Sequence, residues 1–525
     1  MSRMLRASGA AGIATLLSRI LGFVREWALA RFMGTSPVAD AFIMAFTLPN
    51  LFRRLLGEGV LSVAFVPIFK AKEQTQTPSE LWRAVNAVLC ALITICLALI
   101  VLTAVGSTLL MFAVDLPIET DLMLRLVRIM FPYLLFVCIA AVFIGVLNAR
   151  GHFFLPAIGT VVLNVVLIGS IFFLAPQFGT ELSTQVFGLA IGVLVAGIAQ
   201  AVFQLPSLWK EGYRPVWVNP LEDSTVREVA ARMAPATIGA AAFQLNVVIT
   251  QWMAASHGKS IVSSFNYAVR LMELPQGVFG ISMATFLLTE LSHLSAQKKY
   301  PEFRATLREG ILNVVFLNAL ATGLLCVLAE PIVRLLFEYR MFDADSTDRT
   351  SLALQYLAPG LILFSLNNIL TRAFFALGDV KTPMRISIFC LSVNILLAMA
   401  LLPQLKQGGL GLANSMSACI NSALLLYALR RKLPSFEFAS MRAPLLAILG
   451  VAVLAGLCAW GAHFTWERRL GHQGIPLRAG AVFVPILLST GVYFLVALWM
   501  RLPQAKDIVG VFLKRLRKSK PPEGI

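Results

Sequence analysis

Five arginines stand inside long apolar segments of the chain, where a charge needs a chemical reason. Arg19 and Arg25 fall in segment 8–31, and Arg53, Arg54 and Arg270 fall in two later segments. A central arginine costs on the order of 2.5–3.5 kcal/mol to place in a bilayer, so these side chains should face a polar cavity or strong partners. A guanidinium presents a planar fork of donors that fits phosphate oxygens bidentately. The pattern therefore predicts a cavity that binds an anionic cargo.

Pairing or snorkelling is the alternative explanation for each of these arginines. Arg54 can meet Glu58 at i+4, and Arg270 can meet Glu273 at i+3. Snorkelling could carry the head group to water where the arginine lies near the end of its segment, as do Arg25 and Arg372. Arg19 has no carboxylate one turn away, so the alternative explains it least well.

Long apolar helices must position these side chains, and the hydropathy pattern predicts about fourteen of them. The predicted segments are 8–31, 39–69, 83–112, 122–148, 153–175, 184–206, 224–256, 260–295, 305–330, 348–377, 382–403, 410–431, 441–464 and 477–500. The second, seventh and eighth are longer than one crossing needs, which predicts tilted, bent or projecting helices.

Composition places the chain in the membrane. It has 525 residues, of which 58% are hydrophobic and only 14% are charged, far fewer charges than a soluble domain carries. Backbone groups in lipid must be satisfied within the segment, and these runs are too long and too uniformly apolar for barrel strands. The sequence therefore predicts an all-α polytopic membrane protein.

The net charge of +17 is explained by topology rather than by nucleic-acid binding. Basic residues gather in alternate short loops, as the positive-inside rule requires, whereas the opposite loops are acidic or mixed. An even number of spans and the basic tail predict that both termini lie in the cytoplasm. The basic loop residues include Lys70, Lys72, Arg83, Arg150, Lys210, Arg214, Lys298, Lys299, Lys381, Arg430, Arg431 and Lys432.

Weak internal similarity suggests two related lobes. Residues 149–156 resemble 376–383, and the following runs 163–167 and 393–397 also match. Their common order predicts two parallel six-helix lobes around a central cavity, the usual frame for alternating access. The predicted domains are an N-terminal lobe, a C-terminal lobe, two additional helices and a basic cytoplasmic tail, at residues 1–215, 216–435, 436–500 and 501–525.

Catalytic and metal-binding patterns are missing from the sequence. The seven cysteines form no CxxC pair, and the five histidines have no zinc spacing. The string 258–260 lacks the upstream glycine of a phosphate loop, because Met253 occupies that position. We therefore expect no enzyme activity, no metal, no cofactor and no direct use of ATP.

Several motifs resemble the MurJ (MviN) family of lipid II flippases. In the first helix the similar segment is SRILGFVRE at 18–26, where Glu26 replaces the aspartate common in the family. The other similar segments are DAF at 40–42, LPNLFRR at 48–54, EG at 58–59, FVP at 65–67, RLMELPQGV at 270–278 and GDVKTP at 378–383. The resemblance extends over nearly the whole chain.

The resemblance implies the fourteen-helix fold of the multidrug/oligosaccharidyl-lipid/polysaccharide exporters. It also implies transport of lipid II, an undecaprenyl-diphosphate-linked peptidoglycan precursor, from the cytoplasmic to the periplasmic leaflet. The family's essential arginines correspond to Arg19, Arg25, Arg53 and Arg270, with Asp40 as a further candidate. We expect supporting roles for Glu26, Arg54, Glu58 and Glu273, and a lipid-tail groove formed by the last two helices.

The same residues can be compared with what four other classes of protein would need. A drug–cation antiporter of this fold should show more carboxylates than arginines inside the membrane, and a transferase or ligase would need a catalytic grouping that the outer loop 331–350 lacks. A scaffold does not explain central arginines, whereas a polysaccharide-unit flippase remains open because its cargo also carries a diphosphate. We expect a monomer that is driven by the membrane potential and contacts cell-wall synthesis or division proteins, with the coupling ion undetermined.

Overall fold

The computed structural model describes residues 3–56, 60–152, 154–433 and 439–518, and within these ranges the chain forms helices and no strands. Nine of the described helices are long and apolar enough to cross a membrane. The number of candidate spans rises to as many as eleven if each of two bent helix pairs forms one span. The prediction of an all-α polytopic membrane protein is confirmed, whereas the number fourteen stays a prediction.

The N-terminal unit comprises Met1–Ser263 together with Tyr339–Phe342. Within it α1 packs on α7, and α2 packs on α5. Both α6 and α7 pack on α8, and α10 packs on α2, α3 and α4. Its helices are α1 (Arg3–Met33), α2 (Pro37–Leu56), α3 (Val60–Thr75), α4 (Pro78–Ala113), α5 (Ile118–Met130), α6 (Tyr133–Ala149), α7 (Phe154–Gly169), η1 (Ser170–Leu174), η2 (Ala175–Phe178), α8 (Leu182–Val202), α9 (Leu205–Lys210) and α10 (Ser224–His257).

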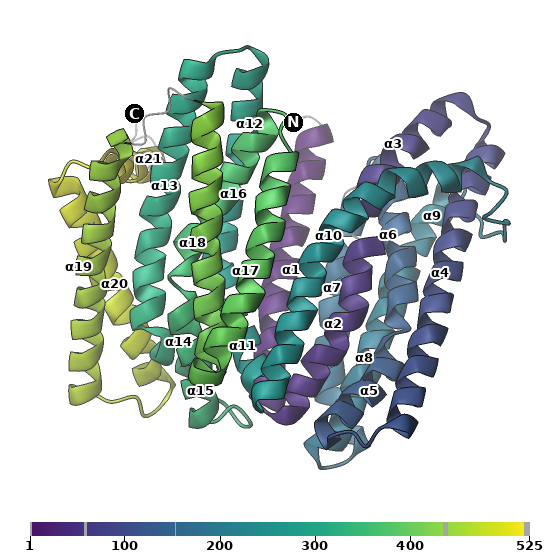
Figure 1. The fold of residues 1–525 in the computed structure, drawn as a ribbon, viewed down its shortest axis with the longest axis horizontal. Helices are drawn as coiled ribbons and strands as arrows, with labels where there is room; N and C mark the ends of the chain where they lie inside the picture. The colour runs from purple at the N-terminus through teal and green to yellow at the C-terminus, as the bar shows by residue number, and fades with distance from the viewer. Residues whose placement is uncertain (1–2, 57–59, 153, 434–438, 519–525) are drawn as a thin grey trace, which may run out of the picture. The chain divides into compact units, whose positions relative to one another are not determined.

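The C-terminal unit comprises Ser264–Glu338 and Asp343–Ile525. Here α17 packs along α18, α19 along α20, and α13 contacts both α16 and α19 (Figure 1). The helices are α11 (Ile261–Pro275, which begins in the other unit), η3 (Gln276–Ile281), α12 (Ser282–Ala296), α13 (Tyr300–Val327), α14 (Ala329–Phe337), α15 (Ala344–Leu357), α16 (Gly360–Ala376), α17 (Lys381–Leu405), α18 (Gln407–Lys432), α19 (Ala439–Arg469), α20 (Ile475–Trp499) and α21 (Pro503–Lys518).

Three predicted single spans are each two helices. Residues 39–69 divide into α2 and α3, on either side of residues outside the described ranges. Segment 122–148 bends by 41° between α5 and α6, and segment 348–377 bends by 46° between α15 and α16. Pro132 and Pro359 stand directly before the second helix of each bent pair. A proline has no N–H to donate to the preceding turn, which explains the location of both bends.

Two helices lie where the sequence predicted none. The predicted loop 331–350 contains most of α14, which buries Pro331, Val333 and Phe337. The predicted basic tail contains α21. Both helices are too short to cross a bilayer, so a search for apolar runs of about twenty residues passes over them.

The two stretches matched by the internal similarity, 149–156 and 376–383, contain turns with the same hydrogen bonds. After α6, Gly151 has φ +85° and the His152 amide donates to the Leu147 carbonyl at 2.8 Å. After α16, Gly378 has φ +75° and the Asp379 amide donates to the corresponding carbonyl, five residues earlier, at 2.9 Å. This is a glycine-terminated helix cap in both places. The division into lobes at residue 216 stays a prediction, and α10 is grouped with the N-terminal unit.

The motif GDVKTP ties three helices together through Asp379. Its carboxylate accepts hydrogen bonds from the Thr382 amide at 3.0 Å and hydroxyl at 2.6 Å, and it lies 2.5 Å from the Lys432 ammonium at the end of α18. Burial raises the pKa of the Asp379 carboxyl, but Lys432 and the Thr382 hydrogen bonds outweigh it and hold that pKa well below its usual range. Asp379 is therefore ionised in the folded protein at neutral pH.

Replacing Asp379 with asparagine should lower stability in a pH-dependent manner. A depressed folded-state pKa stabilises above the unfolded-state pKa, and this contribution is lost as the pH falls through the folded value. From pH 8 to about pH 5 the wild type should unfold at a higher temperature than Asp379→Asn. The difference in the free energy of unfolding should be no more than about 1 kcal/mol. The difference should narrow below about pH 4. A difference in unfolding temperature that stayed the same from neutral pH to well below about pH 4 would contradict the assignment.

Close packing of α8 against η1 and η2 depends on two glycines. A Cβ on Gly188 would stand 2.8 Å from the Ala175 Cα, and a Cβ on Gly192 would stand 2.3 Å from the Ser170 Oγ. The spacing Gly-x-x-x-Gly therefore permits close approach of the helices.

We expect Gly188→Ala to destabilise the protein by about 1–3 kcal/mol, because the backbone of Ala175 must move. Gly169→Ala is the matched control, since a Cβ there meets nothing within 4 Å. Thermal unfolding in detergent, followed with a thiol-reactive dye, should give a lower midpoint for Gly188→Ala than for Gly169→Ala. Equal midpoints would show that this contact can relax without cost.

Candidate functional site

One face of α1 is built from the motif that carries the first two arginines. Ser18, Gly22 and Arg25 recur at intervals of four and three residues, so they share a face. The Arg25 Nη1 donates to the Asn164 Oδ1 of α7 at 3.0 Å, and the Asn164 Nδ2 donates to the Ser18 carbonyl at 3.2 Å. The Ser18 hydroxyl donates to the Thr160 hydroxyl at 2.8 Å. This face therefore fixes Arg25 against α7.

Arg25 also has a carboxylate partner. Its Nη2 lies 2.6 Å from the Glu26 Oε1, and both side chains are mostly buried. Arg19 lies on a different face of α1, and its side chain is exposed on the protein surface. Snorkelling to water was the alternative for Arg25 from the sequence, whereas the structure pairs its guanidinium with Glu26 and Asn164. Of the two arginines of α1, Arg25 is therefore held by partners and Arg19 is accessible.

The last turn of α2 carries the next two arginines. Arg53 is half-buried and Arg54 is exposed. The Phe52 ring packs on Phe131 with centroids 5.7 Å apart, which holds this end of α2 against the end of α5. Glu58, the predicted partner of Arg54, lies outside the described residues.

Arg270 lies on α11 in the C-terminal unit. Its Nη1 is 2.9 Å from the Glu273 Oε2, so the predicted i+3 pair is present. Both side chains remain substantially exposed, at 40% and 49%. The π-helical turn η3 follows directly after Pro275, and such turns are frequent at functional sites. Arg19, Arg25 and Arg53 therefore belong to one unit and Arg270 to the other.

Asp40 has a structural role in the described chain. It is 6% exposed, and its two carboxylate oxygens accept the backbone amides of Ser260 at 2.6 Å and Ser263 at 2.7 Å. Ser260 has φ +68°, which is uncommon for a residue with a side chain. Asp40 thus satisfies amides at the start of α11 and holds the turn that leads into that helix.

Replacing Asp40 with asparagine should cost about 1.5–3 kcal/mol, because an amide supplies one acceptor oxygen where the carboxylate supplies two, and the bonds lose their charge assistance. Asp223→Asn is the matched control. Asp223 caps α10 through the single amide of Thr225 at 2.8 Å, so its loss should be about 1 kcal/mol or less. Thermal unfolding would measure both. A transport defect in Asp40→Asn without any loss of stability would instead place Asp40 in cargo binding.

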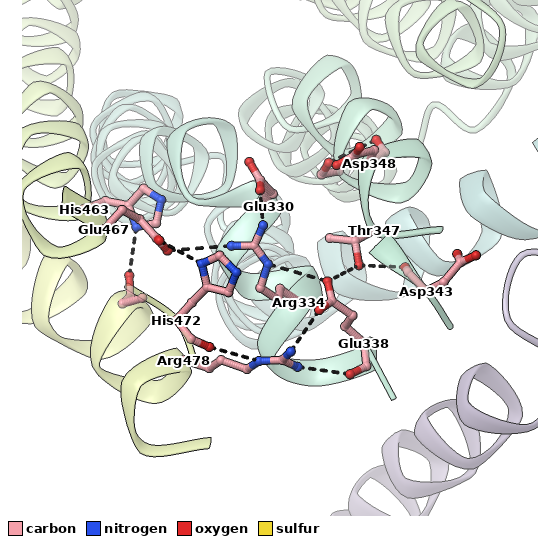
Figure 2. Close-up of polar contacts among 12 residues, drawn as sticks. Glu330, Arg334, Glu338, Asp343, Thr347, Asp348, His463, Glu467, His472 and Arg478 are labelled. Atoms are coloured by element: carbon pink, nitrogen blue, oxygen red, sulfur yellow. Dashed lines mark hydrogen bonds and ion pairs between the residues drawn. The ribbon is translucent and has the colours of Figure 1, made fainter. Parts of the chain in front are cut away.

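A second polar cluster joins α14 to the α19–α20 helix pair (Figure 2). Arg334 pairs with Glu330, with Glu338 at 3.5 Å and with Glu467 at 3.6 Å. Arg478 pairs with Glu338 at 3.0 Å. No catalytic grouping was expected within loop 331–350, and this cluster forms because Glu467 of α19 and Arg478 of α20 come to lie beside that loop. The interval of four residues between Glu330, Arg334 and Glu338 was the available signal.

The carboxylates of this cluster are engaged with cations. Glu467 also lies 2.8 Å from the His472 Nδ1, and Glu338 accepts the Thr347 hydroxyl at 2.9 Å. In the described part of the chain no group of three or more His, Cys, Asp or Glu side chains could hold a metal ion. The cluster therefore acts as a connection between α14, α15, α19 and α20.

Comparison with solved structures identifies the class of membrane protein that has this fold. The chain matches an inward-facing multidrug resistance MATE family transporter of the MOP superfamily with a TM-score of 0.65 and 13% identity, over 80% of this chain and 95% of that one. It matches a lipid II flippase MurJ in an inward closed conformation with a TM-score of 0.77 and 23% identity, over 94% and 98%. The fold is that of the MOP superfamily of transporters.

Comparison with sequences gives the family. The chain is 36% identical to lipid II flippase MurJ of Burkholderia cenocepacia over 501 residues, which are 93% of this chain and 95% of that protein. The family model described as lipid II flippase MurJ matches residues 29–476. The chain therefore belongs to the MurJ family, and the resemblance stated from its motifs is confirmed.

Proposed function

We propose that this protein is a flippase that moves lipid II from the cytoplasmic to the periplasmic leaflet by alternating access. The observation that carries the proposal is that arginine side chains stand on apolar helices of both units in a chain of the MurJ family. Arg19, Arg25, Arg53 and Arg270 would bind the diphosphate and head group. The polyprenyl tail would stay in lipid, along the last two long helices.

The carboxylate neighbours suggest which ion pairs the arginines of the site form when no cargo is bound. Glu26 holds Arg25 and Glu273 holds Arg270. An approaching diphosphate accepts from the same guanidinium donors and competes with these carboxylates. Pairing would reduce the cost of keeping a cation inside the membrane protein, and cargo binding would exchange one anionic partner for another.

The membrane potential would drive the cycle. An inside-negative potential favours outward movement of an anionic cargo and inward return of an empty cationic site, at about 2.3 kcal/mol per charge per 100 mV. A coupling ion is not assigned.

We propose that the protein is a transporter rather than an enzyme and needs no cofactor. We further propose that it is a monomer in the inner membrane with both termini cytoplasmic, and that it contacts cell-wall synthesis or division proteins.

Leaflet-resolved labelling of lipid II tests the function directly. In cells depleted of this protein, lipid II should collect on the cytoplasmic side and return to its normal distribution when the wild-type protein is restored. A normal distribution during depletion, in cells without a second flippase, would remove lipid II as the cargo and favour another diphosphate-linked lipid.

A further inference from the structure

A pocket of about 520 Å³ lies at one end of α4 in the N-terminal unit and takes no part in the proposed transport site. Its volume falls within the range of small-molecule sites. One wall is a single face of α4, because its residues recur at intervals of three, one and three positions: Ser79, Trp82, Arg83 and Asn86. The other wall is the segment from Gly212 to Asn219, which has no regular secondary structure.

The wall formed by residues 212–219 is held in place by specific contacts. The Asn86 Nδ2 donates to the Arg214 carbonyl at 2.9 Å, and the Val218 amide donates to the Cys90 Sγ at 3.5 Å. The Tyr213 ring is buried and packs edge-on against Trp82, with centroids 5.7 Å apart. The pocket is therefore a built feature of this unit.

The pocket is positively charged. Arg83 and Arg214 line it, and no acidic residue does. Arg214 uses one Nη to donate to the carbonyls of Trp209 and Tyr213, which leaves its other donors available. Within the described ranges, neither guanidinium lies within ion-pair distance of a carboxylate. Two guanidinium groups without an acidic partner suit a phosphate group.

Exposed apolar side chains next to the pocket indicate its depth in the membrane. Val216, Trp217 and Leu221 are 60%, 68% and 78% exposed, and Trp217 lines the pocket itself. Tryptophan is enriched where hydrocarbon meets head groups. Along α4 the uncharged run 84–113 begins directly after Arg83. The pocket thus lies at the level of the lipid head groups, on the side that the basic loops assign to the cytoplasm.

We propose that this pocket binds the phosphate head group of an anionic phospholipid of the cytoplasmic leaflet. Arg83 and Arg214 hold the phosphate, and the acyl chains lie along the apolar side chains of the 216–221 segment. The bound lipid fastens this end of the N-terminal unit to the leaflet, independently of the cargo.

Lipid binding to the purified full-length protein tests this. Phosphatidylglycerol and phosphatidylcholine with the same acyl chains are titrated, and the bound lipids are counted by native mass spectrometry. The wild type should bind one phosphatidylglycerol about ten times more tightly than phosphatidylcholine, and Arg83→Gln/Arg214→Gln should lose that preference. The control Arg125→Gln/Arg232→Gln removes two exposed charges of the same unit, from pairs with Asp121 and Glu228, and should keep it.

Three results would overturn the proposal. The first is an unchanged preference in Arg83→Gln/Arg214→Gln, or an equal loss in the control. The second is displacement of phosphatidylglycerol by millimolar glycerol phosphate, which would show that the pocket takes a soluble phosphate. The third is loss of lipid II transport by Arg83→Gln/Arg214→Gln in vesicles of phosphatidylcholine alone, which would place the pocket on the cargo's path. The same vesicles with wild-type protein report separately on the proposed function.

Discussion

Cells in which Arg270→Ala is the sole copy of this protein are expected to accumulate lipid II in the cytoplasmic leaflet, as depleted cells do. Removing one partner of a charged contact in a binding site typically costs 2–5 kcal/mol, which corresponds to a transport rate lower by roughly 30-fold or more. Arg19→Ala should have a similar effect, because its exposed guanidinium is available to cargo. Leaflet-resolved labelling, with protein amounts checked by blot, measures both.

Glu273→Gln distinguishes cargo binding from structural pairing. If Arg270 only paired with Glu273, at 2.9 Å, then losing either partner would have the same effect. If Arg270 binds the diphosphate, Glu273→Gln should keep most of the activity and Arg270→Ala should not. Arg372→Ala is the control for loss of a positive charge, since Arg372 lies near the end of α16 with its guanidinium 6.0 Å from the Phe375 ring centre. Equal defects in Arg270→Ala and Glu273→Gln would remove Arg270 from the cargo site.

Replacing Arg334 with methionine is expected to lower the free energy of unfolding by about 3 kcal/mol. The Arg334 side chain is only 15% exposed and pairs with Glu330, Glu338 and Glu467. Without it three carboxylates would lie close together with less compensation, and breaking a buried pair from one side costs 3–5 kcal/mol. The exposure of Glu330, at 45%, keeps the expected loss at the lower end of that range.

Arg349→Met provides the comparison for this prediction. Arg349 pairs with Asp345 within α15, and both side chains are more exposed, so its loss should be below 1 kcal/mol. Thermal unfolding in detergent should separate the two variants clearly. A midpoint for Arg334→Met as high as that for Arg349→Met would mean that the cluster in Figure 2 contributes little to holding α14 against α19 and α20.

The class of the protein and most helix positions could be predicted from the sequence, because long uncharged runs leave few alternatives in a bilayer. Local pairs could also be predicted, as with Arg270 and Glu273, since helical spacing brings them together. The glycine turns after α6 and α16 could be predicted for the same reason, because a helix cap is determined within a few residues.

Contacts between distant residues could not be predicted in this way. Asn164, one of the two partners of Arg25, is 139 residues away, and the amides held by Asp40 lie 220 and 223 residues away. Nothing in the local pattern of α2 indicates that Asp40 would hold the start of α11. The polar cluster at α14 was missed because Glu467 and Arg478 belong to elements that are far away in the sequence. Short helices such as α14 were missed because their apolar stripes are shorter than a span.

The contact between α1 and α7 has a consequence for how the chain is made. Arg25 meets Asn164, which is 139 residues further along the chain. At a synthesis rate of about 5–20 residues per second, α1 leaves the ribosome on the order of ten seconds before α7 exists. During that time its arginines cannot use α7 as a partner. Until then Arg25 has Glu26 of its own helix as a partner, and we expect α1 to become a fixed part of the bundle only after the fifth predicted segment is made.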